Sequence, residues 1–115
     1  MNLSYGASLD LIRGYAKSRR LGNSQAVVIV CPGYPVLPEA AKILKKSPVK
    51  LGAQDSAAAL SGAHTGEVSP LVLREIGAEY VIIGHSERRE QLHENSPIIN
   101  AKLAAALEAG LTSML

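Results

Sequence analysis

One histidine in this sequence is placed where it can polarise a bound substrate. His85 follows an apolar run, Tyr80–Ile83, with Gly84 between them. A histidine just past a buried strand can donate a hydrogen bond to a substrate oxygen, and the glycine leaves room for close approach. For a lone histidine, the competing interpretation is a bond to a loop carbonyl. The carboxyl end of a strand favours the functional role, because α/β proteins bind their ligands at that edge.

Ser86 and Glu87 each have two interpretations. Gly84 and Ser86 match the start of the Gly-x-Ser-x-Gly turn that carries a hydrolase nucleophile, but the fifth position is Arg88. Arginine does not fit that cramped turn, so Ser86 is predicted to cap a helix instead. Glu87 can transfer protons or pair with Arg88 or Arg89, and the spacing favours the ion pair.

The remaining reactive side chains predict no second site. His64 lies in a loop of small residues and His93 in a polar stretch, so both are expected to be exposed and not catalytic. Cys31 is the single cysteine, which excludes an internal disulfide and favours a reducing, cytoplasmic compartment. No metal-ligand spacing surrounds it, and no cofactor is expected.

Composition limits the class of protein. With 115 residues, 47% of them hydrophobic, the chain is long enough for one modest core, so residues 1–115 are expected to form a single domain. The formal charge of +2 is scattered, and Trp and Phe are absent, which argues against nucleic-acid binding. The start lacks a secretory pattern and no apolar run reaches membrane-spanning length, so no membrane association is expected.

Apolar periodicity predicts helices alternating with parallel strands. The strands are continuous apolar runs, which is typical of parallel sheets buried on both faces. Helices are expected from Ser4 to Gly22-Asn23, then over 35–46, 69–77 and 98–109, with strands over 26–31, 49–53, 80–83 and 111–115. The caps are expected at Ser4, Ser69 and Ser96, and the last helix is expected to bury Ile99, Leu103, Ala106 and Leu107.

Two architectures fit this alternation, an open doubly wound sheet and part of a closed (β/α)₈ barrel. Periodicity does not choose between them. The turn after the first predicted strand, Cys31–Pro35, is not the glycine-rich cradle of a dinucleotide fold.

Two long motifs resemble the triose-phosphate isomerase family. They are Gly62-Ala63-His64-Thr65-Gly66-Glu67-Val68-Ser69 and the run Ile76–Arg89, which contains Gly84-His85-Ser86-Glu87. Weaker similarity at Val30–Pro32 and Leu51–Asp55 extends the match along the chain. The resemblance implies an α/β fold that is a partial (β/α)₈ barrel of about three to four parallel βα units.

The resemblance also implies roles for individual residues. His85 corresponds to the electrophile that polarises the carbonyl while D-glyceraldehyde 3-phosphate and dihydroxyacetone phosphate interconvert, in glycolysis and gluconeogenesis. A helix beginning at Ser86 would help to keep that imidazole neutral, as in the family. Glu87 corresponds to a supporting carboxylate and Ser86 to a residue near the site. The loop Thr65-Gly66-Glu67 corresponds to the segment through which family homodimers contact the partner's active site.

Other parts of the family pattern are not in these residues. Met1-Asn2 resembles the tail of the first-strand motif, so the first strand with its lysine is expected to be missing. Leu115 falls within the fifth strand, before the catalytic glutamate, the lid and the phosphate-binding glycines, so no substrate-binding residue is expected here. The alternative function is therefore a catalytically inert, truncated fragment that acts as an interaction or complementing segment.

Overall fold

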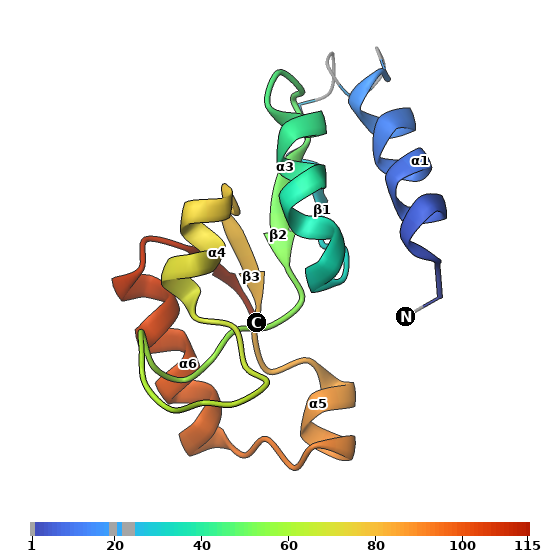
Figure 1. The fold of residues 1–115 in the computed structure, drawn as a ribbon. Helices are drawn as coiled ribbons and strands as arrows, with labels where there is room; N and C mark the ends of the chain where they lie inside the picture. Colours follow the sequence, from blue (N-terminus) through green and yellow to red (C-terminus); the bar gives the residue numbers. More distant parts are fainter. Residues whose placement is uncertain (1, 19–20, 22–24) are drawn as a thin grey trace.

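The computed structural model describes residues 2–18, 21 and 25–115, and in these residues four strands form one parallel sheet (Figure 1). The strands lie in the order β1 (Ile29–Val30), β2 (Lys50–Ala53), β3 (Tyr80–Ile82) and β4 (Thr112–Met114). The helices are α1 (Tyr5–Ala16), η1 (Tyr34–Val36), α3 (Leu37–Leu44), α4 (Pro70–Ile76), α5 (Ser86–Gln91) and α6 (Ser96–Glu108). The predicted α/β alternation with a parallel sheet is confirmed.

Three of the four strands match their predicted bounds to within one residue at each end. The first does not, because residues 26–31 were predicted and only two residues form the ladder of β1. β1 lies at the edge of the described sheet and pairs on one side with β2. Lys50 N donates to Val28 O at 2.8 Å, and before that contact the chain leaves the sheet, so that Val27 is 65% exposed.

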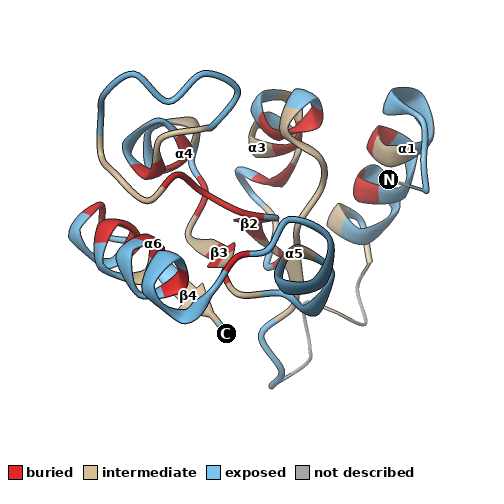
Figure 2. Ribbon diagram, turned by 90° about the horizontal axis from the view of Figure 1, so that it is seen from below, coloured by how far each residue is buried: buried red, intermediate tan, exposed pale blue. Residues whose placement is uncertain are grey.

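The helices cover one face of the sheet, as the arc of α1, α3, α4 and α6 in Figure 2 shows. Leu51, Ala53 and Val81 point into that layer and are buried. Tyr80 and Ile82, on the alternate face of β3, are only half-buried. The strands were predicted to be buried on both faces. That prediction is correct for the face that the helices cover and wrong for the opposite face, because no second layer covers that face in the described residues.

Serine caps begin two of the helices as predicted. Ser4 Oγ accepts a backbone N–H of the first turn of α1 at 3.3 Å, and Ser69 Oγ does the same for α4 at 3.1 Å. Gly77 ends α4 with φ of 110°, a left-handed conformation that glycine adopts without strain. α1 ends at Ala16 with Lys17 as its C-cap, so it stops short of the predicted end at Gly22-Asn23, which lies outside the described residues.

The cap of α6 is one residue earlier than predicted. Asn95 Oδ1, and not the hydroxyl of Ser96, accepts the N–H of Ile98 at 3.1 Å. Asn is as good a cap as Ser, and Pro97 then occupies the first turn, where its missing N–H leaves no bond unmade.

The buried stripe of α6 also differs from the predicted one. Ile99 and Ala106 are buried as expected, but Leu107 is 64% exposed. The buried positions are Ile99, Lys102, Ala105 and Ala106. The buried stripe therefore includes Lys102, which a search for apolar residues at helical spacing does not detect.

The helices within residues 2–18 and 25–115 are all short. The longest, α6, has 13 residues, whereas a bilayer core takes about 20 helical residues to cross. Within the described part of the chain, no helix is long and apolar enough to span a membrane.

Candidate active site

The loops that follow the strands gather at one end of the sheet, the lower end of Figure 1 and the end facing the viewer in Figure 2. His85 lies there, two residues after the fully buried Ile83, which directly follows β3. Gly84 makes the turn between them with φ of 73°, in the left-handed region that disfavours other residues. The predicted position of His85 at a carboxyl strand end is confirmed.

His85 is itself the N-cap of α5, which corrects the prediction that Ser86 caps this helix. The Nδ1 atom of His85 accepts the backbone N–H of Glu87 at 3.3 Å. Because Nδ1 is the acceptor in this contact, the ring atom left to donate to a bound molecule is Nε2. With its side chain 47% exposed, His85 can present that atom to a bound molecule.

Glu87 does not pair with an arginine as the spacing had suggested. Its Oε2 atom lies 3.8 Å from His85 Nδ1, beyond hydrogen-bond distance, and its side chain is 75% exposed. Arg88 and Arg89 instead turn away from it, to Glu94 and to Gly84 O respectively. Glu87 therefore stands beside the imidazole with its carboxylate free in solvent.

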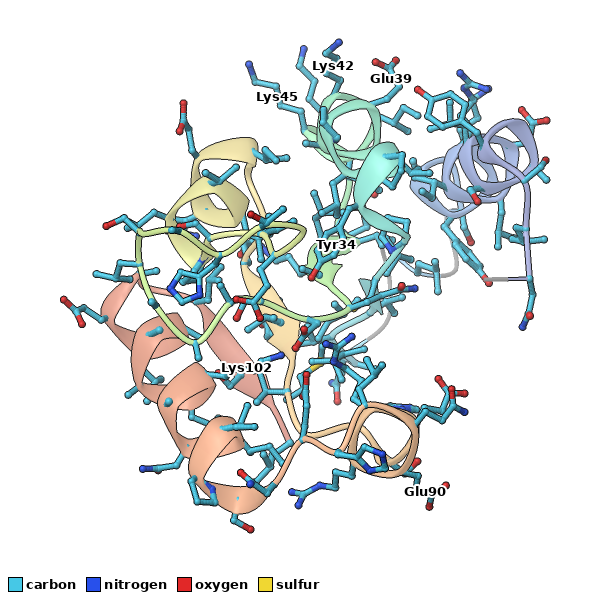
Figure 3. The ribbon with its side chains drawn as sticks, turned by 60° about the horizontal axis from the view of Figure 1, so that its bottom comes forward. Tyr34, Glu39, Lys42, Lys45, Glu90 and Lys102 are labelled. Atoms are coloured by element: carbon cyan, nitrogen blue, oxygen red, sulfur yellow. The ribbon has the colours of Figure 1, made fainter. Side chains whose placement is uncertain are left out.

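A cluster of four charged side chains joins α5 to its neighbours, and three of them, Asp55, Glu94 and Lys102, are buried. Lys102, only 1% exposed, donates to Asp55 at 2.7 and 2.8 Å and to Glu94 at 2.6 Å. Arg88 contacts Glu94 at 2.6 Å and Asp55 at 2.9 Å. Figure 3 shows Lys102 directed inward from α6, whereas Glu90 on α5 points outward. The cluster joins α5, α6 and the end of β2, so it holds the helix that His85 caps.

The two carboxylates of this cluster have opposite pKa shifts. Burial raises the pKa of Asp55, and the hydrogen bond and positive charge of Lys102 offset this only in part. Burial also acts to raise the pKa of Glu94, but hydrogen bonds from Arg88 and Lys102 outweigh it and leave that pKa below its usual value. Glu94 is therefore the carboxylate that the two cations hold most firmly in its charged form.

Asp55 appears in the sequence analysis only as the end of the motif Leu51–Asp55, and neither Glu94 nor Lys102 was singled out. A signal for Lys102 was present, because it lies three residues after Ile99 and four before Ala106, on the buried stripe of α6. A lysine at a buried helix position predicts buried acidic partners, since an unpaired charge there is costly. The sequence does not identify those partners, because Asp55 lies 47 residues from Lys102 and Glu94 lies eight residues from it.

The loop between β2 and α4 projects Thr65, Gly66 and Glu67 into solvent. Its base is closed by Ala57 N donating to Val68 O at 2.8 Å. At its tip, His64 Nδ1 lies 3.2 Å from Glu67 Oε2. His64 is thus exposed as expected, and it has a partner within the loop.

A groove of about 570 Å³ lies between α1 and the residues that end β1 and β2. Its walls are mainly apolar and include Tyr5, Ile12, Cys31 and Pro32, with Gln54 at the rim. Gln54 Nε2 donates to Cys31 O at 2.9 Å and so ties the two strand ends together. Burial raises the pKa of the Cys31 thiol to about 11, which disfavours the reactive thiolate form.

The other predicted features lie apart from His85 or form no site. His93 is exposed and has φ of 54°, in the turn between α5 and α6. In the part of the chain that the structure describes, no group of three His, Cys, Asp or Glu side chains is arranged to bind a metal ion.

Comparison with known proteins identifies the family of this arrangement. The family model described as triosephosphate isomerase matches residues 1–115. The triosephosphate isomerase of Chlamydia trachomatis is 36% identical over all 115 residues, which cover 42% of that protein. The one from Acidiphilium cryptum is 40% identical over 114 residues, 99% of this chain and 45% of the relative.

A solved structure agrees with the sequence matches. The crystal structure of triosephosphate isomerase from Bartonella henselae superposes with a TM-score of 0.88 at 36% identity. It covers 98% of this chain, and the match occupies 46% of that protein. The fold is therefore part of a (β/α)₈ barrel, as predicted, and the chain spans less than half the length of the relatives it matches.

Proposed function

The chain belongs to the triosephosphate isomerase family, and we propose that the protein interconverts D-glyceraldehyde 3-phosphate and dihydroxyacetone phosphate, with His85 as the electrophile. The observation that supports this most directly is the cap geometry of His85. Its Nδ1 atom accepts the Glu87 N–H at the carboxyl end of β3, which leaves Nε2 as the ring atom that can donate to substrate.

A neutral imidazole suits the chemistry of this reaction. The proton moves between adjacent carbons through an enediolate, and negative charge develops on the substrate oxygens. A donor fixed before the reaction stabilises that charge without reorganisation, and loss of such a donor costs about 10²–10³ in rate. Polarisation by a neutral histidine is an established property of the family. Here Glu87 is proposed to support the site as a neighbouring carboxylate, and Ser86 to hold the first turn of α5.

Residues 1–115 do not contain the whole catalytic set of the family. The resemblance places the first-strand lysine, the catalytic glutamate and the phosphate-binding glycines outside them. An imidazole that polarises a carbonyl produces no turnover if no base removes the proton. We therefore expect residues 1–115 alone to be inert, so that as an isolated polypeptide they would act only as an interaction or complementing segment.

We also propose that the protein forms a homodimer through the tip Thr65-Gly66-Glu67. The tip is exposed, and the groove beside α1 offers apolar walls near the carboxyl ends of β1 and β2. A projecting loop from one copy and a groove on the other are the two halves of a reciprocal contact, as two-fold symmetry requires. The partner's tip would then lie close to the strand ends that form the active site.

A cytoplasmic location and a role in glycolysis and gluconeogenesis follow from the same proposal. Both substrates are soluble phosphate esters of central carbon metabolism. Cys31 is the sole cysteine of these residues, so they form no internal disulfide, which is compatible with a reducing compartment.

The proposal is tested by assaying the protein at its full natural length, whatever segments flank residues 1–115. We expect isomerisation of glyceraldehyde 3-phosphate, and we expect His85→Gln to lower kcat by about 10²–10³. His93→Gln, which changes an exposed histidine between α5 and α6, is the matched control and should leave kcat unchanged. Full activity in the His85→Gln variant would refute the role assigned to His85. An inactive full-length protein would favour the alternative function, a catalytically inert segment that acts through interaction or complementation.

A further inference from the structure

We propose that Arg89 is a positioning residue for His85 and acts through the backbone carbonyl of Gly84. This inference rests on the proposed function, because positioning matters only if the imidazole polarises a substrate. The hydrogen bond of the Arg89 side chain goes to the Gly84 carbonyl and not to the ring nitrogen of His85 that would meet substrate. Its effect is on the peptide from which His85 projects.

The first argument is the hydrogen bond itself. Arg89 Nε donates to Gly84 O at 2.8 Å. The Gly84 carbonyl and the His85 N–H belong to one planar peptide unit, so holding the oxygen fixes the plane that leads into His85. A charged donor makes such a bond stronger than a neutral one.

The second argument is that this peptide needs to be held. Gly84 has φ of 73°, and glycine is the residue with the widest range of alternative backbone conformations. A glycine directly before a reacting residue lets that residue swing unless something fixes the turn. Arg89 returns from the next turn of α5 to the carbonyl of this glycine and closes the turn.

The third argument is that the Arg89 guanidinium packs directly against the turn at Gly84. A Cβ built on Gly84 would lie 3.1 Å from Arg89 Nη2 and 3.3 Å from Ile99 Cγ2. Leu115 Cδ1 would be at 3.4 Å. The turn is therefore packed between the guanidinium and two apolar side chains, and a bulkier residue at position 84 would displace Arg89 or strain the turn.

The two arginines of α5 thus have different tasks. Arg88 points inward to Glu94 and Asp55 and anchors the helix to α6 and β2. Arg89 points back to the turn that precedes the helix. Arg88 fixes where α5 lies, and Arg89 fixes the peptide by which His85 enters it. Together with the Nδ1 bond to Glu87 N, this sets the direction of Nε2.

The experiment replaces Arg89 in the full-length protein. Arg89→Met keeps the apolar stem and removes the donor, and Arg89→Lys keeps a charged donor of different shape. Arg74→Met is the matched control, because Arg74 also donates a guanidinium hydrogen bond to a backbone carbonyl, that of Ala78, on a different helix. The readouts are kcat, KM and the ¹⁵N signals of the His85 ring, which report which nitrogen carries the proton.

We expect Arg89→Met to lower kcat about tenfold while KM changes less than about twofold, because a displaced catalytic group loses rate and not ground-state binding. The His85 ¹⁵N signals should move away from the single Nε2–H form, Arg89→Lys should restore part of both effects, and Arg74→Met should change neither. Unchanged kcat and unchanged ¹⁵N signals in a folded Arg89→Met protein would overturn the proposal.

The ring signals separate this proposal from the proposed function. They require no turnover, so they report whether Arg89 orients His85 even if the full-length protein shows no isomerase activity. An inactive protein whose His85 signals respond to Arg89→Met would refute the function and leave the positioning contact intact.

Discussion

Replacing Lys102 with methionine tests whether the buried charge cluster holds the site region together. Lys102 is 1% exposed and makes three contacts of 2.6–2.8 Å to Asp55 and Glu94. Its removal leaves two buried carboxylates with one guanidinium, so the net charge of the cluster changes from zero to minus one. Removing one partner of a buried ion pair typically costs about 3–5 kcal/mol, and we expect a loss of free energy of unfolding in that range.

The loss should depend on pH in a defined direction. The positive charge and hydrogen bond of Lys102 act to lower the pKa of Asp55, which burial nevertheless holds above its usual value of 3.8. Without Lys102, that pKa rises further. A carboxyl whose pKa is higher in the folded than in the unfolded state gains stability as pH falls through the interval between the two values. The destabilisation of Lys102→Met should therefore be smaller at pH 5 than at pH 7.5.

Urea unfolding of the full-length protein at the two pH values measures both effects. Lys42→Met is the control, because Lys42 is a 74% exposed lysine paired with Glu39, and its loss should cost within about 0.5 kcal/mol. Figure 3 shows Lys42 projecting from the surface. The double variant Asp55→Asn/Lys102→Met should recover at least about 2 kcal/mol, since it removes the uncompensated charge. The reasoning fails if Lys102→Met costs less than about 1 kcal/mol, or costs more at pH 5 than at pH 7.5.

Two further outcomes follow from the turn at Gly84 and the tip at Thr65. Gly84→Ala should destabilise the protein by about 2 kcal/mol in thermal unfolding, because its φ is 73° and the space is filled. Gly14→Ala should instead be neutral or slightly stabilising, because the added carbon meets nothing within 4 Å beyond its chain neighbours and the backbone of its own helix. Thr65→Arg should weaken the homodimer at least about tenfold in sedimentation velocity, because the cationic side chain cannot enter an apolar groove without desolvation. Ala104→Arg, on the exposed side of α6, should not weaken it, and an unaffected dimer in Thr65→Arg would show that the tip does not insert.

The elements that the sequence predicted well are those specified by neighbouring residues. The Ser69 cap, the Pro70 that follows it and the Gly77 stop lie within nine positions, and each acts on its own turn of helix. The strands β2 and β3 were likewise predicted closely, because continuous apolar runs of this length fit a parallel sheet.

The errors arose where backbone conformation or a buried partner decides between alternatives that residue type and spacing leave open. Ser86 is a good cap by residue type, but the turn at Gly84 places His85 one position earlier, where its own ring nitrogen caps α5. Glu87 had arginines at suitable spacing, yet Arg88 found Glu94 and Asp55 in a buried setting. A buried, hydrogen-bonded pair outweighs a solvent-exposed one.

By itself, the sequence determined the family motifs, the alternation of helices and strands, and the place of His85 at a carboxyl strand end. Those features depend on residue type and short spacing. The tertiary structure decided which nitrogen of His85 accepts a bond, and which carboxylates neutralise Lys102 across 47 and eight residues. It also decided that Arg89 closes the Gly84 turn. The Lys102 contacts depend on how β2, α5 and α6 pack together, and no local pattern specifies that packing. The His85 and Arg89 contacts join residues two and five positions apart, and they depend on the backbone conformation of the turn at Gly84.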